Sequence, residues 1–126
     1  MCLDSLLVEA KLTETGFQKC PLSRLIRYRE LDRVFNVEDL PVTGGSVASY
    51  QLIRGVLAAH HLQRSFVVLC DARRRDLIES WFQIMRTVQD HALRSRLALL
   101  TWQELAALLP ATLQLFLQKK YGITPA

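Results

Sequence analysis

The chain has 126 residues, half of them hydrophobic and 22% charged, a composition that excludes both an intrinsically disordered and a collagen-like protein. This length accommodates a single domain over residues 1–126 with one hydrophobic core. The net charge of +4 is uneven, because residues 46–126 carry ten Lys or Arg against five Asp or Glu; this excess indicates either a face for a polyanion such as nucleic acid or an ordinary solvated surface.

The first third of the chain begins with a predicted strand and continues with less regular patterns. The apolar run Leu6–Ala10 ends in polar residues and predicts a buried β-strand. Residues 13–21 are polar, contain a glycine and a proline, and predict a loop. Residues 22–40 have apolar positions that fit a helix, but Asp and Arg residues crowd the same segment. Residues 41–45 contain Pro and two Gly and predict a turn that could serve as a hinge.

Two helices and one strand are predicted in the middle of the chain. Ser46 is a good N-cap residue for a helix that runs to about Leu62. The continuous apolar run Ser65–Cys70 predicts a strand that is buried on both faces. Between about Arg74 and His91, apolar residues recur every three or four positions and predict an amphipathic helix.

The last part of the chain predicts a third buried strand and a final helix. The strand covers residues 96–100, and Thr101 with Glu104 fits a capping box, in which the two side chains satisfy amides at the start of a helix. Pro110 interrupts or restarts this helix, and Gly122 ends it. The alternation of strands and helices predicts an α/β fold with a mixed, largely parallel central sheet flanked by helices on both faces.

Several environments are disfavoured by the sequence. The longest apolar run, Leu105–Leu109, is far shorter than the roughly 18 residues that a membrane span needs. The first residues lack the basic region of a secretory signal. Cys2, Cys20 and Cys70 are too few and too widely spaced for a disulfide framework or a four-ligand metal site. We therefore expect a cytoplasmic protein without a membrane-spanning segment.

Glu9 and Lys11 are the residues to which the sequence most clearly assigns chemistry. Side chains two positions apart on a strand project from the same face, so both should emerge together at the end of the first strand. A carboxylate can hold Mg²⁺, and the carbonyl of Ala10 can add a second oxygen ligand. An ammonium beside them can steer a water molecule and neutralise charge on a phosphate. The alternative is an ordinary ion pair at an exposed strand end.

This arrangement resembles the PD-(D/E)XK superfamily of restriction-endonuclease-like nucleases. The resemblance is carried by Glu9-Ala10-Lys11 at the end of an apolar strand, by residues 49–54 in the helix that follows, and by the later order of strands and helices. Residues 66–69, 101–102 and 120–122 extend it to an uncharacterised prokaryotic branch of these nucleases. The resemblance spans nearly the whole chain and implies a restriction-endonuclease-like fold that hydrolyses DNA phosphodiesters with Mg²⁺ or Mn²⁺.

The resemblance also implies roles for individual residues. Glu9 and the carbonyl of Ala10 would ligate the metal ion, and Lys11 would position the attacking water. Gln51 and Arg54, three apart on one helical face, would hold the water or the phosphate. The alternative interpretation of Gln51 and Arg54 is an exposed helix face.

One part of the superfamily pattern is missing. Its first acidic residue normally lies on the preceding strand, a dozen or more positions upstream, whereas Asp4 is five positions before Glu9. In an extended chain that separation is roughly 16 Å, too long for a shared ion, and a turn at Ser5 would consume part of the strand. We therefore expect an amino-terminally truncated nuclease, with a homo-oligomer or partner chain covering the uncovered edge.

Arg73, Arg74 and Arg75 form the densest group of cations, at the start of a predicted helix where the macrodipole opposes them. They indicate substrate binding, with Arg73 and Arg74 as candidates, or simple solvation. The sequence thus predicts a Mg²⁺-dependent DNA endonuclease by descent, whose activity this truncated chain can have lost. The alternative is a non-catalytic remnant of the same fold that binds nucleic acid or a protein.

Overall fold

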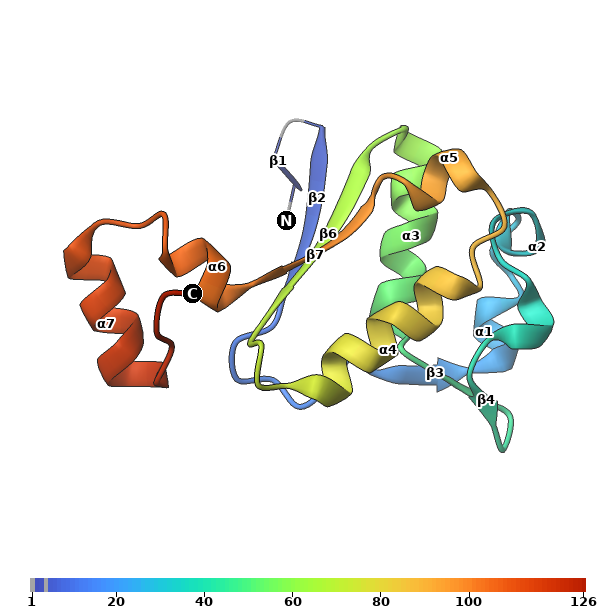
Figure 1. Cartoon of the computed structure of the whole chain (residues 1–126). Coiled ribbons are helices and arrows are strands. Elements are labelled where there is room, and N and C mark those ends of the chain that lie inside the picture. Colours follow the sequence, from blue (N-terminus) through green and yellow to red (C-terminus); the bar gives the residue numbers. More distant parts are fainter. Residues whose placement is uncertain (1, 4) are drawn as a thin grey trace.

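Three parallel strands form the centre of the main sheet (Figure 1). The computed structural model describes residues 2–3 and 5–126. β2 (Leu6–Ala10), β6 (Ser65–Cys70) and β7 (Leu97–Thr101) are parallel, and β1 (Cys2–Leu3) pairs antiparallel with β2, which gives the order β1-β2-β6-β7. The three predicted apolar runs are therefore confirmed as strands, and the predicted α/β class with a mixed, largely parallel sheet is confirmed.

A turn at Ser5 connects β1 to β2 and does not shorten the strand that carries Glu9. Leu3 pairs with Leu6, which is the opposite end of β2 from Lys11. The expected conflict between this turn and the strand is therefore wrong, because the pairing needs only two residues of β1. Asp4 itself lies outside the described residues.

A small second sheet occupies much of the region predicted as loop and turn. β3 (Lys19–Pro21) and β4 (Val42–Thr43) both pair antiparallel with β5 (Ser46–Ala48), in the order β3-β5-β4. Gly44 and Gly45 connect β4 to β5 with φ angles of +58° and +79°, a conformation that glycine adopts without the steric penalty of a side chain. The turn prediction for this position is confirmed, and the loop predicted over residues 13–21 is shorter than expected.

The helix predicted to have Ser46 as its N-cap begins three residues later than expected, as α3 (Tyr50–Leu62) with Ser49 at the N-cap position. Ser46 belongs to β5, and Ser49 precedes the helix in a left-handed conformation without a side-chain capping bond. The amides of Tyr50 and Gln51 instead donate to the carbonyls of Gln18 and Phe17, each at 3.0 Å. The N-cap prediction is wrong because backbone carbonyls from a distant loop satisfy the start of the helix.

The segment over residues 22–40, which the sequence left ambiguous, forms short helices. They are α1 (Leu22–Leu25), α2 (Leu31–Val34) and the 3-10 turn η1 (Val37–Asp39). The next long helix, α4 (Arg75–Arg86), is shorter than predicted and is followed by α5 (His91–Arg94). Shortly after the carboxyl-terminal end of α4, Val88 forms an antiparallel bridge with Phe35, which connects this region to the short helices.

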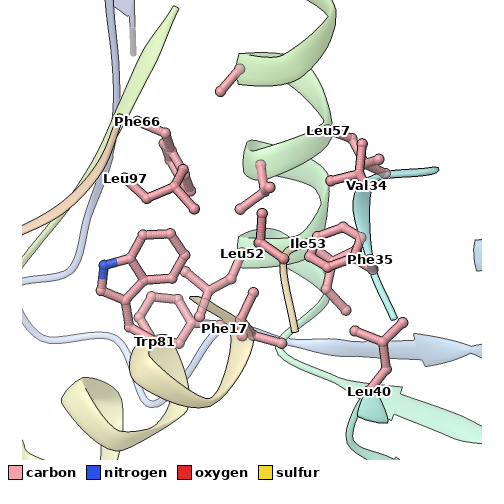
Figure 2. Close-up of a cluster of buried hydrophobic side chains, with 14 of the residues drawn as sticks. Phe17, Val34, Phe35, Leu40, Leu52, Ile53, Leu57, Phe66, Trp81 and Leu97 are labelled. Atoms are coloured by element: carbon pink, nitrogen blue, oxygen red, sulfur yellow. The ribbon is translucent and has the colours of Figure 1, made fainter. Parts of the chain in front are cut away.

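The main core surrounds α3 (Figure 2). Leu52 and Ile53 on α3 are fully buried, and Figure 2 shows Phe66, Leu97 and Trp81 facing the helix from the sheet and α4. The Trp81 ring meets Phe66 edge-on with centroids 5.4 Å apart, and its indole N–H donates to the carbonyl of Ala98 at 3.0 Å. These contacts fix α3 and α4 against the same face of the sheet.

Burial alternates along the strands of the main sheet. Phe66, Val68 and Cys70 are buried against the helices; on the other face Leu69 is buried, Val67 is half-buried and Ala98 is exposed. The prediction that Ser65–Cys70 is buried on both faces therefore holds only in part. Leu69 is buried on the second face, but Val67 is not, because α3 and α4 cover the first face and the second remains partly open (Figure 1).

The last two helices form a separate carboxyl-terminal lobe. α6 (Trp102–Ala106) begins with the predicted capping box, which is confirmed, and α7 (Ala111–Tyr121) ends at Gly122 as predicted. Figure 1 shows both helices on the opposite side of β6 and β7 from α3 and α4. A second apolar cluster holds the lobe together; it consists of Ala106, Leu117, Ile123, Leu12, Trp102, Leu109 and Tyr121. Across the described part of the chain, no helix is both long and apolar enough for a membrane crossing.

Candidate functional site

Glu9 and Lys11 project from the same face at the end of β2, as their spacing predicts. The Nζ atom of Lys11 lies 3.3 Å from Oε1 of Glu9. The backbone N–H of Lys11 donates to the carbonyl of Leu69 at 2.8 Å, which continues the parallel ladder one residue past β2. Both side chains are therefore positioned by β2, which pairs with β6, and they lie on the face of the sheet that α3 covers.

The ammonium of Lys11 is buried and has several partners. Its side chain is only 6% exposed, and Nζ donates to Oε1 of Gln51 at 2.7 Å. The Phe17 ring centroid is 5.6 Å from Nζ, and the indole N–H of Trp102 donates to the Lys11 carbonyl at 2.8 Å. A cation removed from water needs such compensation, and the Glu9 carboxylate supplies the opposite charge.

The first turn of α3 places Gln51 beside Lys11. The N–H of Gln51 donates to the Phe17 carbonyl, so the loop that caps α3 is also the loop that sets the Phe17 ring against Lys11. One local arrangement thus fixes the helix start, the amide and the ring together. The predicted proximity of Gln51 to the Glu9–Lys11 pair agrees with this geometry.

Arg54 lies one helical turn after Gln51 and shares a hollow with it. The hollow has a volume of about 250 Å³, and its polar lining comes from Glu9, Gln51 and Arg54. Arg54 is exposed, and its guanidinium carbon lies 5.4 Å from the centroid of the Tyr50 ring. A planar guanidinium at the rim of such a hollow can bind phosphate oxygens in a bidentate manner.

Gly55 allows α3 to approach β6 closely at this hollow. A Cβ atom at Gly55 would lie 2.3 Å from Cζ of Phe66, a distance that non-bonded carbon atoms do not tolerate. The missing side chain therefore sets the helix–strand separation on which the Lys11–Gln51 hydrogen bond depends.

Oxygen atoms suitable for a hard cation lie at Glu9 and Ala10. The Glu9 side chain is 27% exposed and lines the hollow. Because Lys11 directs its N–H toward Leu69, the alternating ladder directs the backbone groups of Ala10 away from β6. Mg²⁺ usually keeps several waters and binds through one or two carboxylates, so this donor set fits it. No group of three His, Cys, Asp or Glu side chains suited to a metal occurs within residues 2–3 and 5–126.

Glu14 is engaged elsewhere, although it follows Lys11 closely in the sequence. One of its carboxylate oxygens accepts the amides of Leu12 and Thr13 at 2.7 and 3.0 Å. Hydrogen bonds from its own backbone amide and that of Leu12 lower the pKa of Glu14. The carboxylate therefore stabilises the turn after β2.

Arg73 and Arg74 gather at a different place, beyond the end of β6. Arg73 donates to both carboxylate oxygens of Asp71, with Nη2 2.6 Å from Oδ2, and to the Tyr121 carbonyl at 2.8 Å. Arg74 pairs with Asp76 at 2.8 Å and also donates to the carbonyls of residues 14 and 15. These contacts of Arg73 and Arg74 are to the protein itself, and their predicted contact with substrate stays a prediction.

Asp71 is a buried carboxylate that the sequence interpretation did not single out. The Arg73 guanidinium holds the pKa of Asp71 well below its usual range, and the Gln103 amide also donates to the same carboxyl at 2.8 Å. Gln103 in turn accepts the amide of Ala72 at 2.9 Å. This cluster connects the end of β6 to α6 and to the last residues of α7.

Sequence reasoning also missed the aromatic residues around Lys11. Phe17 and Trp102 contact Lys11 from positions 6 and 91 residues away in the sequence. The hydroxyls of Tyr28 and Tyr50 form a hydrogen bond of 2.9 Å that joins the loop after α1 to α3. The sequence indicates only that aromatic residues are present. It does not reveal which of them contact residues that are distant along the chain.

A comparison with known families agrees with this architecture. Residues 1–122 match the family model REase-ARP, described as Restriction Endonuclease associating with ARP. The match covers nearly the whole chain, so the protein belongs to this restriction-endonuclease-like family, and the resemblance inferred from the sequence is confirmed. No curated protein and no solved structure matches the chain.

Proposed function

We propose that this protein is a metal-dependent phosphodiesterase that acts on DNA, with Glu9, Lys11 and Gln51 at its centre. The observation that carries the proposal is the buried Nζ atom of Lys11, held between the Glu9 carboxylate and the Gln51 amide. Glu9 and Gln51, the two partners of this ammonium, also line the hollow that Arg54 shares.

Lys11 can act on a water molecule or on a phosphate oxygen. An ammonium group has three N–H donors; one of them donates to Gln51, and the Glu9 carboxylate pairs with Nζ at 3.3 Å. A remaining donor is available for the attacking water or for the negative charge that develops on the phosphate. Gln51 and Glu9 fix the direction of this donor, because each holds Nζ from a different element.

Glu9 and the Ala10 carbonyl would hold Mg²⁺ or Mn²⁺, and Arg54 would bind the phosphate. A bound divalent cation would supply Lewis-acid stabilisation and acidify a water molecule. Arg54 would keep the scissile or the neighbouring phosphate in the hollow by bidentate hydrogen bonds.

Plasmid cleavage tests this proposal directly. The full chain, Glu9→Ala and Lys11→Ala would be incubated with supercoiled plasmid in Mg²⁺ or Mn²⁺, with exposed Glu79→Ala and Lys119→Ala as matched controls. We expect nicking by the parent and the controls, and its loss in both site variants. Absence of cleavage by the parent, or full activity of both site variants, contradicts the proposal.

We also propose a second function, association with ARP through the carboxyl-terminal lobe, which the family description suggests. The lobe exposes large apolar side chains: Leu108 is 84% exposed, and Leu113, Leu115 and Phe116 are each about half exposed. Exposed apolar groups in such a cluster indicate an interaction surface more often than a solvated one.

Co-purification with ARP tests this second function. Leu115→Glu should abolish co-purification, while Thr112→Glu, which adds the same charge at an exposed position of α7, should not. Equal retention by both variants contradicts the proposal. A dimer of the isolated chain that Leu115→Glu dissociates would also contradict it, because the surface would then serve self-association.

A further inference from the structure

The hollow at Glu9 and Gln51 continues along α3 into a larger one. Arg54 and Ala58 line both hollows, so the two are contiguous on one face of the helix. The larger hollow has a volume of about 450 Å³, within the range of about 300–1,000 Å³ typical of small-ligand sites. A third hollow, of about 230 Å³, shares Tyr28 with the second. We call these three hollows together the α3 groove.

The larger hollow combines an aromatic ring, apolar side chains and cations. Its lining consists of Tyr28, Arg29, Glu30, Arg54, Leu57, Ala58 and His61. The Tyr28 hydroxyl is bonded to that of Tyr50 at 2.9 Å, which fixes the orientation of the Tyr28 ring at the wall of the hollow. A fixed aromatic ring beside aliphatic groups is a surface on which a nucleobase can stack.

The charges along the α3 groove are those that a polyanion requires. In the described part of the chain, Arg24, Arg27, Arg29 and Arg54 form no ion pair with a carboxylate. Glu30 is the one acidic residue lining the larger hollow, and it lies 3.4 Å from Nε2 of His60. Four arginines therefore keep their donors for a ligand, and phosphates are the anions that such planar donors bind in pairs.

We infer that the larger hollow is a subsite for an unpaired nucleotide of the nucleic-acid strand that enters the candidate active site, an inference that rests on the nucleic-acid binding part of the proposed function. The base stacks on Tyr28 beside Leu57 and Ala58, and Arg29 and Arg54 bind the flanking phosphates. A base that is still paired in a duplex cannot enter such a hollow without leaving the stack.

The length of α3 is compatible with a nucleic-acid strand that lies along the helix. Gln51 and His61 are separated by ten helical residues, or about 15 Å at 1.5 Å per residue. This corresponds to about four nucleotides at the 3.4 Å spacing of a stacked strand. The subsite therefore lies a few nucleotides from the phosphate that Lys11 and Glu9 would contact, and Arg24 and Arg27 extend the track beyond it.

Fluorescence anisotropy in a chelating buffer tests the inference without cleavage. The probes are a labelled oligothymidylate and a blunt duplex of the same length. Tyr28→Leu keeps apolar bulk but removes the ring, and it should weaken single-strand binding about 5–100-fold. Arg29→Ala, at an exposed position, should lower the slope of log affinity against log salt by about 0.7, while Arg75→Ala should leave it unchanged.

The outcomes separate this inference from the proposed cleavage. Selective loss of single-strand binding in Tyr28→Leu and Arg29→Ala supports the subsite, even if the parent cleaves no plasmid and the proposed nuclease activity fails. Equal weakening of single strand and duplex overturns it, as does unchanged binding by both variants or a parent that binds no single strand. Circular dichroism tests whether Tyr28→Leu is folded. If this variant is unfolded, the salt dependence of single-strand binding by Arg29→Ala tests the subsite instead.

Discussion

The two groups of arginines in this protein differ in what they contact. Arg54 and Arg29 line the α3 groove and have no carboxylate partner in the described residues. Arg73 and Arg74, two of the three arginines in the densest cationic run of the sequence, are paired with Asp71 and Asp76. Local charge density is therefore a poor guide to a binding face. What matters is whether the fold leaves the donors of each cation unengaged.

The same comparison separates two buried ionic clusters. Lys11 is joined to Glu9 and Gln51 beside a hollow that reaches solvent. Asp71 is joined to Arg73 and Gln103 at the junction with the carboxyl-terminal lobe, and its hydrogen bonds are to the protein. We expect substitutions in the first cluster to affect chemistry and those in the second to affect stability.

After the loss of cleavage expected for Glu9→Ala and Lys11→Ala, the next largest effect is expected for the rate of cleavage by Gln51→Ala. This change removes the acceptor that orients Lys11, and the loss of such an orienting partner typically lowers activity about 10–100-fold. The matched control, Gln83→Ala, removes an exposed amide from α4 and should leave the rate unchanged. Initial rates of plasmid nicking measure both. Equal rates for the two variants would show that Gln51 does not position Lys11.

Gly55→Ala should destabilise the protein through packing alone. The added Cβ would approach the Phe66 ring to 2.3 Å, so α3 or the ring must shift, and overpacking of this kind costs about 1–3 kcal/mol in the free energy of unfolding. Gly16→Ala is the control, because its Cβ would meet no atom within 4 Å and its φ is not positive. Urea denaturation compares them. A stable Gly55→Ala protein would mean that the helix–strand spacing at the site is adjustable.

The fold was largely predictable where the chain forms local patterns. The apolar runs of β2, β6 and β7 and the Thr101–Glu104 capping box follow from sequence periodicity and turn chemistry. The start of α3 was not predictable, because the carbonyls that satisfy its amides come from residues 17–18. For the same reason β5 could not be recognised, since its partners lie more than twenty positions upstream and in the preceding turn.

The candidate site was predictable only in its strand. Alternation along β2 places Glu9 and Lys11 on one face, and this follows from sequence alone. The burial of Lys11 between Phe17 and Trp102 depends on contacts across the chain and left no local signal. The two predicted arginines after β6 are also instructive, because their carboxylate partners lie two residues away on either side of them.

Asp71→Asn should have a moderate effect on stability and none on cleavage. The loss of charge weakens the bonds from Arg73 and Gln103, and we expect a decrease of about 1–2 kcal/mol in the free energy of unfolding at neutral pH. Urea denaturation measures the change, with Glu79→Gln as an exposed control on α4. A loss of cleavage in a folded Asp71→Asn protein would contradict the division between the two clusters.

The pH dependence of Asp71→Asn sharpens this result. The folded-state pKa of Asp71 lies below that of the unfolded chain, so its contribution is present at higher pH and is lost as the pH falls through the folded-state value. The parent should therefore lose its advantage over Asp71→Asn below about pH 4. A constant difference between the two proteins from neutral to acidic pH would contradict the assigned direction of the pKa shift.

The smallest expected effect is on the salt dependence of DNA binding, and it should differ between the two groups of arginines. Arg54→Ala should lower the slope of log affinity against log salt for duplex DNA by about 0.9, as one lost phosphate contact does. Arg74→Ala carries the same change in charge but removes a side chain that is already paired with Asp76. Its slope should stay at the parent value. Equal decreases for both variants would restore Arg74 as a substrate-binding residue.

Binding of Mn²⁺, followed by electron paramagnetic resonance, tests most directly whether Glu9 belongs to a metal site. The parent should bind the ion, Glu9→Gln should lose it, and Glu14→Gln should retain it because that carboxylate is bonded to backbone amides. If the parent binds no Mn²⁺, or if Glu9→Gln binds it as tightly as the parent does, the metal-dependent function proposed for this strand is wrong.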